Sequence, residues 1–215
     1  MSDADVPASA LHAMPIFPLS GVVLFPGALL PLHVFEPRYR QMLADCLATH
    51  GFMAMAFVIS EGGPEDFSGT PKIARVAGAG VVVHHAPLPD GRSNLVLQGR
   101  ARVDLDELPF RAPYRRARAR ILPDVPSPVS AVQRTGLHAA ATAFAASVSK
   151  TDFELPPGIT AGSAADLCAH HLVSDPQARQ LVLEELDVAA RVRLVTSTLA
   201  EQMGRARREN RGKPD

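Results

Sequence analysis

Near the N-terminus the apolar positions come in short runs that prolines interrupt. Ile16–Leu19, Val22–Phe25 and Leu29–Val34 are each typical of a short β-strand. Pro26-Gly27 fits the two central positions of a type II turn. Because proline cannot donate to a sheet ladder, each proline marks an edge or a corner of the sheet. Corners of this kind favour a partly open, barrel-like sheet over a flat one.

The spacing changes to that of a helix after Glu36-Pro37. Apolar residues then recur at intervals of three and four and share one helical face; they are Tyr39, Met42, Leu43, Cys46 and Leu47. Pro37 suits the first helical turn, and Gly51 suits the end of the helix. Phe52–Ile59 is apolar throughout and has the length of a buried strand. Glu61–Pro71, with its glycines and prolines, predicts a loop.

A second β-rich stretch follows that loop. Ile73–Ala86 and Asn94–Gln98 flank Asp90-Gly91, which is a strong hairpin signal. Arg102–Leu108 and Tyr114–Leu122 predict two further strands. In the last strand arginines alternate with apolar residues, so that the arginines share one face of the sheet.

Beyond the next proline-rich segment the apolar spacing is helical throughout. Val129–Val148 predicts a long helix, which is rich in alanine. Ser163 is the predicted N-cap of the next helix, with Asp166 three residues later. Asp175-Pro176 repeats such a start signal, and the amphipathic pattern after it can begin again at Asp187.

These patterns divide the chain into five parts. Residues 1–13 are small and polar and are expected to form a flexible leader, and residues 14–122 are expected to form a β-barrel domain with one inserted helix. Residues 123–130 hold three prolines and predict a linker. Residues 131–207 predict a helical subdomain, and the charged residues 208–215 a flexible tail. The predicted fold class is therefore α+β, a barrel followed by a helical bundle.

Composition adds a few exclusions to this picture. Across 215 residues, 22 Lys and Arg balance 22 Asp and Glu, so no overall charge favours nucleic acid or an anionic membrane as partner. Cys46 and Cys168 lie in helix-like patterns and are expected to be free thiols of a reducing compartment. The acidic first residues do not resemble a signal peptide, and no apolar run has membrane-spanning length. We therefore expect a cytoplasmic protein without a membrane partner.

The motifs of common catalytic and metal sites are absent from the sequence. It contains no G-x-x-x-x-G-K-[ST], no G-x-S-x-G and no C-x-x-C. His84-His85 and His170-His171 are adjacent pairs whose members point in different directions, and Cys168 with His171 makes a single helical couple. We accordingly expect no enzyme, no cofactor and no metal. An enzyme with an unrecognised pocket is the alternative that the sequence supports least.

Two groups of polar residues are candidates for binding. Glu36, Arg38 and Gln41 precede or lie off the apolar stripe of the first helix, so they are expected to face solvent beside the proline-cornered strands. They are either a surface that recognises peptides or an ordinarily solvated helix face.

The second group is the arginine face of the last predicted strand. Arg116, Arg118 and Arg120 form the one local basic feature that could contact RNA or an acidic partner. Aromatic residues, on which bases could stack, are few there, namely Phe110 and Tyr114. The other interpretation is a solvated outer face that discourages association of sheets.

Four segments, in their order along the chain, carry a resemblance to a known family. They read FPLSGVVLFPGALLPLHVFEPRYRQML, LPDGRSNLVLQGRARV, PYRRARA and LVSDPQARQLVLEELDVAARV. Together they resemble the Lon N-terminal, substrate-binding domain family over residues 14–200. More closely, the chain is similar to stand-alone bacterial proteins that consist of this domain without the protease. The resemblance implies a PUA-like β-barrel followed by helices.

The resemblance also implies a function. In full-length Lon proteases this domain helps to gather substrate polypeptides and supports assembly, while an ATPase module and a Ser-Lys peptidase module, both missing here, carry out the chemistry. The leading hypothesis is therefore a non-enzymatic recognition module for polypeptide segments or unfolded clients, with a separate protease as a candidate partner. The alternative is RNA binding through the arginine strand, because PUA-like folds also serve RNA-binding proteins. The sequence does not indicate an oligomeric state.

Overall fold

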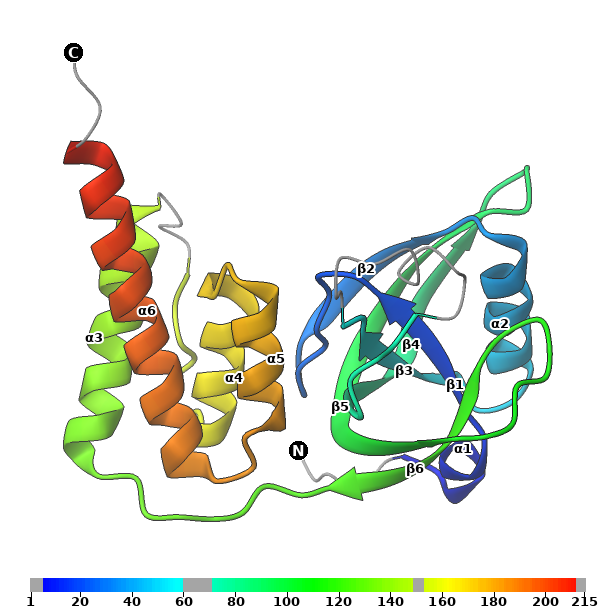
Figure 1. Ribbon diagram of the computed structural model, residues 1–215, viewed down its shortest axis with the longest axis horizontal. Coiled ribbons are helices and arrows are strands. Elements are labelled where there is room, and N and C mark those ends of the chain that lie inside the picture. Colours follow the sequence, from blue (N-terminus) through cyan, green and yellow to red (C-terminus); the bar gives the residue numbers. More distant parts are fainter. Residues whose placement is uncertain (1–5, 60–70, 149–152, 212–215) are drawn as a thin grey trace. The chain divides into compact units, whose positions relative to one another are not determined.

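The computed structural model describes residues 6–59, 71–148 and 153–211, and within them it contains six helices and six strands (Figure 1). The predicted α+β fold class is confirmed. The chain forms two compact units, one through Pro123 and the other from Asp124 onward. Nearly all of the predicted loop Glu61–Pro71 lies outside the described residues.

The first unit is built on one sheet of six strands. The strands are β1 Met14–Leu19, β2 Leu29–Val34, β3 Phe52–Phe57, β4 Val76–Pro87, β5 Ser93–Glu107 and β6 Arg116–Leu122. Their order is β2-β5-β4-β3-β1-β6, and β6 also pairs with β5, so that five strands close into a ring with β2 outside it. Only β1 and β3 run parallel among the named pairs. The result is a β-barrel.

The length of β5 explains how the ring closes. Its first part pairs with β2, from Ser93 to Gln98, and its last part pairs with β6, from Arg102 to Glu107. The sequence predicts two separate strands here, but β5 is continuous, and its pairing with β4 shifts register between Ala79 and Gly80 and between Val82 and His84. The hairpin at Asp90-Gly91 is confirmed, with Gly91 at φ +80° and the Leu88 N–H donating to the Arg92 carbonyl over 2.8 Å.

The predicted strand Val22–Phe25 is wrong, although its apolar character has a physical reason. Val23, Leu24 and Phe25 are buried without belonging to a strand. The carbonyl of Leu24 lies against Gly78 and that of Phe25 against Gly99, where any Cβ would collide with it. The turn that follows is confirmed, since Gly27 has φ +80° and the Ala28 N–H donates to the Phe25 carbonyl over 3.1 Å.

The core of the barrel is made largely of small side chains. A buried cluster holds Met14, Ile16 and Phe52 together with seven alanines from β3 to β6, which are Ala54, Ala56, Ala77, Ala79, Ala101, Ala117 and Ala119. A narrow barrel leaves room for little more than alanine at many inward positions. Val6 and Ala10 also join this cluster, and Ala8–His12 form helix α1. The prediction of a flexible leader is therefore wrong for these residues, because their apolar side chains are buried.

Helix α2, Pro37–Ala48, lies on the outside of the barrel (Figure 1). Four of the five predicted apolar positions are buried, and the ring of Tyr39 lies 4.3 Å from that of Phe17 on β1. Leu47 is the exception, with 42% of its surface exposed. Gly51 has φ +72° and donates its N–H to the Cys46 carbonyl over 2.7 Å, which ends the helix as predicted.

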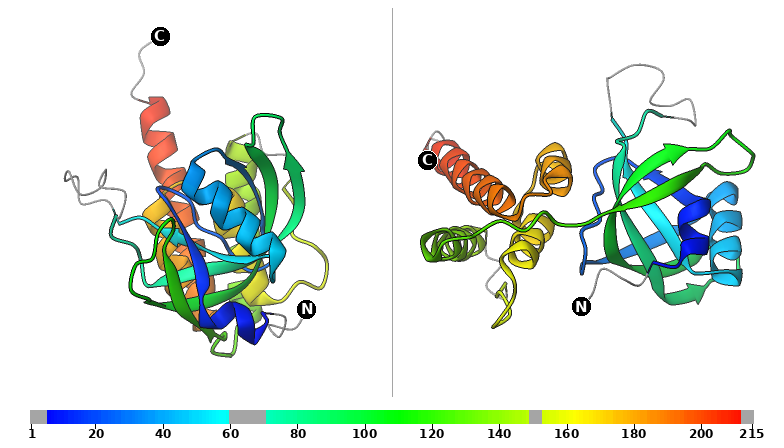
Figure 2. Two further views of the ribbon diagram at one scale, coloured as in Figure 1. Left: turned by 90° about the vertical axis from the view of Figure 1, so that its right-hand side faces the viewer. Right: turned by 90° about the horizontal axis from the view of Figure 1, so that it is seen from below.

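The second unit consists of four helices, which Figure 2 shows from two further sides. They are α3 Ala131–Ser147, α4 Ala161–Leu172, α5 Pro176–Glu184 and α6 Val188–Arg211. The predicted caps at Asp175 and Asp187 are confirmed. Ser163 is not a cap, because Thr160 caps α4 and accepts the Ser163 N–H over 3.2 Å. The predicted tail is helical as far as Arg211, since α6 continues past residue 207.

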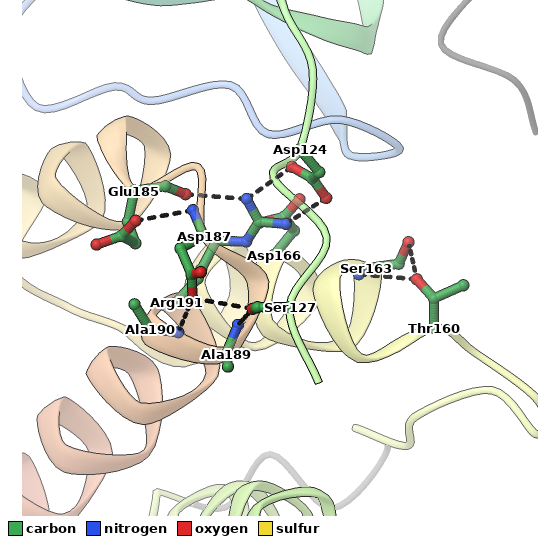
Figure 3. A network of polar contacts seen from close by, with 10 residues as sticks. All are labelled: Asp124, Ser127, Thr160, Ser163, Asp166, Glu185, Asp187, Ala189, Ala190 and Arg191. Atoms are coloured by element: carbon green, nitrogen blue, oxygen red, sulfur yellow. Dashed lines mark hydrogen bonds and ion pairs between the residues drawn. The ribbon is translucent and has the colours of Figure 1, made fainter. Parts of the chain in front are cut away.

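A buried arginine holds the second unit together (Figure 3). Arg191 is 0% exposed and donates to both carboxylate oxygens of Asp124, over 2.8 and 2.5 Å. It also donates to the carbonyl of Glu185 over 2.9 Å and forms an ion pair with buried Asp166 over 3.2 Å. An ideal Cβ at Gly162 would lie 2.8 Å from the guanidinium, so the glycine makes room for it.

The predicted linker 123–130 is attached to the helical unit over much of its length. Besides Asp124, Val125 forms a parallel bridge with Asp187, and its N–H donates to the Leu186 carbonyl over 2.8 Å. Ser127 donates to the Asp187 carboxylate over 3.0 Å and accepts the Ala189 N–H over 2.8 Å (Figure 3). The linker prediction is therefore wrong for residues 124–127, because hydrogen bonds attach them to the helices of the second unit.

Candidate functional site

A groove of about 590 Å³ runs between α2 and the β4–β5 hairpin, and we call it the α2 groove. It is lined by Pro37, Arg40, Gln41, Leu43, Ala44, Leu47, His85, Gly91 and Ser93. Helix α2 supplies the apolar wall, and the hairpin supplies most of the opposite, polar wall. None of the described residues that line the groove carries a carboxylate.

The hairpin tip is shaped to receive a side chain from α2. The guanidinium of Arg40 lies directly against Gly91, where a Cβ would collide with it. Gly91 also has φ +80°, which the turn requires and which side chains disfavour. One glycine thus serves both the turn and the contact between α2 and the hairpin. Asp90 is engaged by Arg92 over 2.6 Å.

The edge of β4 beside the groove is open. Strand β3 pairs with β4 only as far as Val81, and the Val82 N–H donates to the Gly51 carbonyl over 2.9 Å. From Val83 to Pro87, no strand in the described part of the chain pairs with this edge. His85 on this segment lines the groove, and its Nε2 lies 3.1 Å from the Ser93 hydroxyl. Of the residues on this open segment, His85 lines the groove together with the apolar residues of α2.

The structure separates the three residues predicted on the first helix. Gln41 lines the α2 groove. Arg38 instead donates to the Glu36 carboxylate over 2.9 Å and stacks on the ring of Tyr39, 4.6 Å from its centre. Arg38 and Tyr39 lie in a small hollow together with Tyr114. Glu36 and Arg38 thus form a pair of their own, away from the groove lining.

A chain of hydrogen bonds joins one residue from each predicted group. Gln41 donates to Asp45 over 2.8 Å, and the Tyr114 hydroxyl donates to the other Asp45 oxygen over 2.6 Å. Arg116 donates to the Tyr114 oxygen over 3.1 Å and lies 4.6 Å above its ring. The bond from Tyr114 lowers the pKa of Asp45, and burial with this same bond raises the pKa of Tyr114 to about 12.

Sequence patterns do not indicate Asp45 as a binding residue, and they indicate Tyr114 only as an aromatic residue on which a base could stack. Asp45 lies one helical turn after Gln41, so its place on the same side of α2 could have been inferred. Its contact with Tyr114 could not, because 69 residues separate the two in the chain. Tertiary structure alone brings the two candidate groups together.

The arginines of β6 share one face, as predicted. Along this strand Ala117 and Ala119 are buried, while Arg118 and Arg120 are exposed. Acidic residues of β5 oppose them, since Asp104 pairs in register with Arg120 and Asp106 with Arg118. Arg120 forms an ion pair with Asp104 over 3.1 Å. The positive charge of this face is therefore largely balanced by its neighbour strand.

The described residues give little support to a reactive cysteine, a metal site or a membrane span. Cys46 and Cys168 are buried and unpaired, and burial raises the pKa of each thiol to about 12, which disfavours the reactive thiolate. No three His, Cys, Asp or Glu side chains gather at a place fit for a metal within residues 6–59, 71–148 and 153–211. None of the helices described is both long enough and apolar enough to cross a bilayer.

Comparison with known proteins gives consistent matches. The model of the ATP-dependent protease La (LON) substrate-binding domain matches residues 13–201. A Lon protease of Roseiflexus castenholzii is 33% identical over 207 residues, covering 92% of this chain and 25% of that protein. Lon protease 2 of Sorangium cellulosum is 30% identical over 220 residues, covering 94% and 26%. The chain thus spans about a quarter of the length of these relatives.

Solved structures show the same fold. A crystal structure of a Lon N-terminal domain protein from Xanthomonas campestris has a TM-score of 0.64 at 21% identity, covering 86% of this chain and 98% of that one. The N-terminal domain of a Mycobacterium avium complex Lon protease has a TM-score of 0.65 at 12% identity, covering 88% and 98%. With the match of the family model over most of its length, this chain belongs to the Lon substrate-binding domain family.

Proposed function

We propose that this protein is a non-enzymatic recognition module that binds polypeptide segments, among them unfolded clients, in the α2 groove. One observation carries the proposal: His85 lines the groove together with the apolar residues of α2, and it belongs to the segment Val83–Pro87, whose outer edge no described strand pairs with. Membership of the substrate-binding domain family supports it. The proposal extends to a cytoplasmic location and to a separate protease as the recipient of bound clients.

The groove offers both kinds of contact that strand addition needs. An extended peptide can pair its backbone with the open edge of β4, and alternate side chains then point toward α2. Leu47, 42% exposed, and Ala44 offer an apolar surface to such a side chain. Gln41 and Arg40 supply donors at the rim. Ordering a flexible peptide offsets about 2 to 5 kcal/mol of the contact energy, so micromolar affinity is expected.

Peptide binding by a groove variant tests the proposal. Leu47→Glu places a charge on the apolar wall at a position that is already exposed, so the fold should tolerate it. Val132→Glu is the matched control, because Val132 is 81% exposed on α3 and lies outside the groove. On an array of unfolded segments, Leu47→Glu should weaken binding about tenfold, which corresponds to losing one buried apolar contact, and Val132→Glu should not.

Two results would contradict the proposal. One is an equal signal for all segments, folded or unfolded, with the wild-type protein. The other is unchanged binding by Leu47→Glu when Val132→Glu is equally unaffected. Turnover of a peptide by the purified protein, abolished by one substitution, would contradict the non-enzymatic part.

RNA binding is the second candidate, favoured by the exposed face that Arg118 and Arg120 share. It ranks below peptide binding because Asp104 and Asp106 oppose these arginines in register. A gel-shift assay over a range of salt concentrations separates the two functions, since phosphate contacts weaken steeply with salt. Charge reversal at Arg118 and Arg120, which lie outside the α2 groove, should abolish RNA binding and leave peptide binding in the groove unchanged.

A further inference from the structure

A second hollow of about 290 Å³ lies where the chain enters β6, and we call it the arginine pocket. It is lined by Ala13, Leu108, Pro109, Arg111, Tyr114 and Arg116. Two guanidinium groups thus border a space with three apolar residues, and no carboxylate is among the described residues of its lining. A pocket of this composition suits an anion that is attached to an apolar group.

Arg116 is held in place before any ligand arrives. Its guanidinium stacks over the ring of Tyr114 at 4.6 Å and donates one hydrogen bond to the Tyr114 hydroxyl over 3.1 Å. Tyr114 is only 4% exposed, and its own hydroxyl is anchored on Asp45 over 2.6 Å. An arginine has five N–H donors, so a fixed guanidinium that spends one of them on tyrosine keeps others for a ligand.

Arg111 lies on the other side of the same turn from the stacked side chains of Tyr114 and Arg116. An antiparallel bridge joins Arg111 to Tyr114, and its exposed side chain has no hydrogen bond or ion pair with any residue that the structure describes. Arg115 behaves differently, because it binds both oxygens of Glu107 over 2.6 and 2.9 Å. The neighbouring carboxylates are therefore already engaged, Glu107 by Arg115 and Asp45 by Tyr114.

We propose that the arginine pocket binds a carboxylate of a polypeptide client, with the adjoining apolar group packed on Ala13, Leu108 and Pro109. Charge-assisted hydrogen bonds from a planar guanidinium match the two oxygens of a carboxylate. The inference rests on the proposed function and adds a substrate class to it: segments that carry a carboxylate next to an apolar residue. The carboxylate comes either from the end of the chain or from an Asp or Glu side chain.

Fluorescence anisotropy with three labelled peptides tests the inference and separates these sources. One apolar peptide has a free C-terminal carboxylate, the second is the same peptide amidated, and the third is amidated with one internal aspartate. Wild-type protein should bind at least one carboxylate peptide about tenfold more tightly than the uncharged one. Whichever peptide gains affinity identifies the source of the carboxylate.

Variants locate that preference in the pocket. Arg111→Gln and Arg116→Gln should each remove the tenfold difference, and Arg116→Lys, which keeps the charge but loses the planar fork, should restore little of it. Arg118→Gln is the matched control, because it removes the same charge from the same strand outside the pocket. The Arg111 side chain makes no hydrogen bond or ion pair with a described residue, so Arg111→Gln tests the pocket with little effect on the fold.

The outcomes distinguish this inference from the proposed function. Equal binding of all three peptides, weakened by Leu47→Glu, overturns the carboxylate pocket and leaves the α2 groove in place. A carboxylate preference that Arg118→Gln removes as fully as Arg116→Gln also overturns it, because general charge then explains the effect. If none of the peptides binds, both proposals are wrong.

Discussion

Arg191 in the helical unit and Arg116 in the barrel unit are held by different kinds of partner. In the helical unit Arg191 is 0% exposed, and its charge is met by Asp124 and Asp166 inside the fold. In the barrel unit Arg116 rests on the face of Tyr114 and borders a hollow that no carboxylate lines. The comparison shows that the partner of an arginine decides its role. Carboxylates neutralise the guanidinium and accept its N–H donors within the fold. An aromatic ring holds the guanidinium in place and leaves N–H donors available to a ligand.

The reason for this difference lies in how each unit is crosslinked. In the barrel unit, backbone ladders join segments that are distant in sequence, such as β1 and β6 or β2 and β5. Helices satisfy most of their backbone internally, so residues 124–127 are attached to them largely through side chains, with one backbone bridge at Val125. Arg191 and Ser127 provide that attachment.

The largest expected effect follows from removing the buried cation. Arg191→Ala leaves Asp166, whose side chain is 5% exposed, buried without its counter-charge, so the free energy of unfolding should fall by about 3 to 5 kcal/mol. Far-ultraviolet circular dichroism in denaturant follows the helices. Tyrosine fluorescence follows the barrel alone, because the only two tyrosines, Tyr39 and Tyr114, lie there and tryptophan is absent. Only the helical transition should shift.

The control for that prediction is Arg193→Ala, which removes an exposed arginine from the same helix and should change stability by no more than about 0.5 kcal/mol. An equal shift of the tyrosine transition with Arg191→Ala would contradict the separate roles of the two units.

A smaller effect, in the other unit, comes from filling a close approach in the barrel. At Gly99 a Cβ would collide with the carbonyl of Phe25, so Gly99→Ala should cost about 1 to 3 kcal/mol and shift the tyrosine transition first. Gly136→Ala is the opposite control, because nothing lies within 4 Å of a Cβ there. As a helix position, it should gain about 0.5 to 1 kcal/mol. If Gly99→Ala and Gly136→Ala changed the free energy of unfolding in the same direction, the prediction would be contradicted.

The smallest effect concerns the tyrosine that holds Arg116. Tyr114→Phe removes one hydroxyl bonded to Asp45 and should cost about 1 kcal/mol at neutral pH. Burial raises the pKa of Tyr114 from 10.0 to about 12, so the folded state holds this proton more tightly than the unfolded state. The resulting stability is complete below pH 10 and is lost as pH rises through about 12.

Unfolding in denaturant at several alkaline pH values measures that loss, and tyrosinate absorbance measures the titration itself. The variant should lack both the late-titrating tyrosine and the associated fall in stability, while Tyr39 still titrates and serves as the internal control. The assignment would be contradicted if the titration that disappears in Tyr114→Phe occurs near the ordinary pKa of 10.0 in the wild-type protein.

Local patterns predicted the elements whose structure depends on neighbours in the chain. Strand β2 has the predicted bounds Leu29–Val34, and the turns at Gly27 and Gly91 are where glycine and its neighbours placed them. The alternation of arginine and alanine along β6 is also as predicted. Each of these features rests on backbone geometry and a period of two, which a short sequence window contains.

The errors have two causes, which are burial by segments far away in the sequence and, at Ser163, a competing cap three residues earlier. Val22–Phe25 has the apolar character of a strand, but it is buried against Gly78 and Gly99 without a ladder. Ser163 has the form of a cap, but Thr160 takes that role. Within the candidate site, Gln41 was found from its helical position, whereas Asp45 became visible only through Tyr114.

The sequence by itself determined the α+β class, the positions of most elements and membership of the Lon substrate-binding domain family, because periodicity, turn residues and motif order are local properties of the chain. Which polar side chains contact one another follows from the tertiary structure alone. The α2 groove, the arginine pocket and the Arg191 network each depend on side chains brought together across many residues. Such contacts follow from packing and strand register, which no local pattern contains.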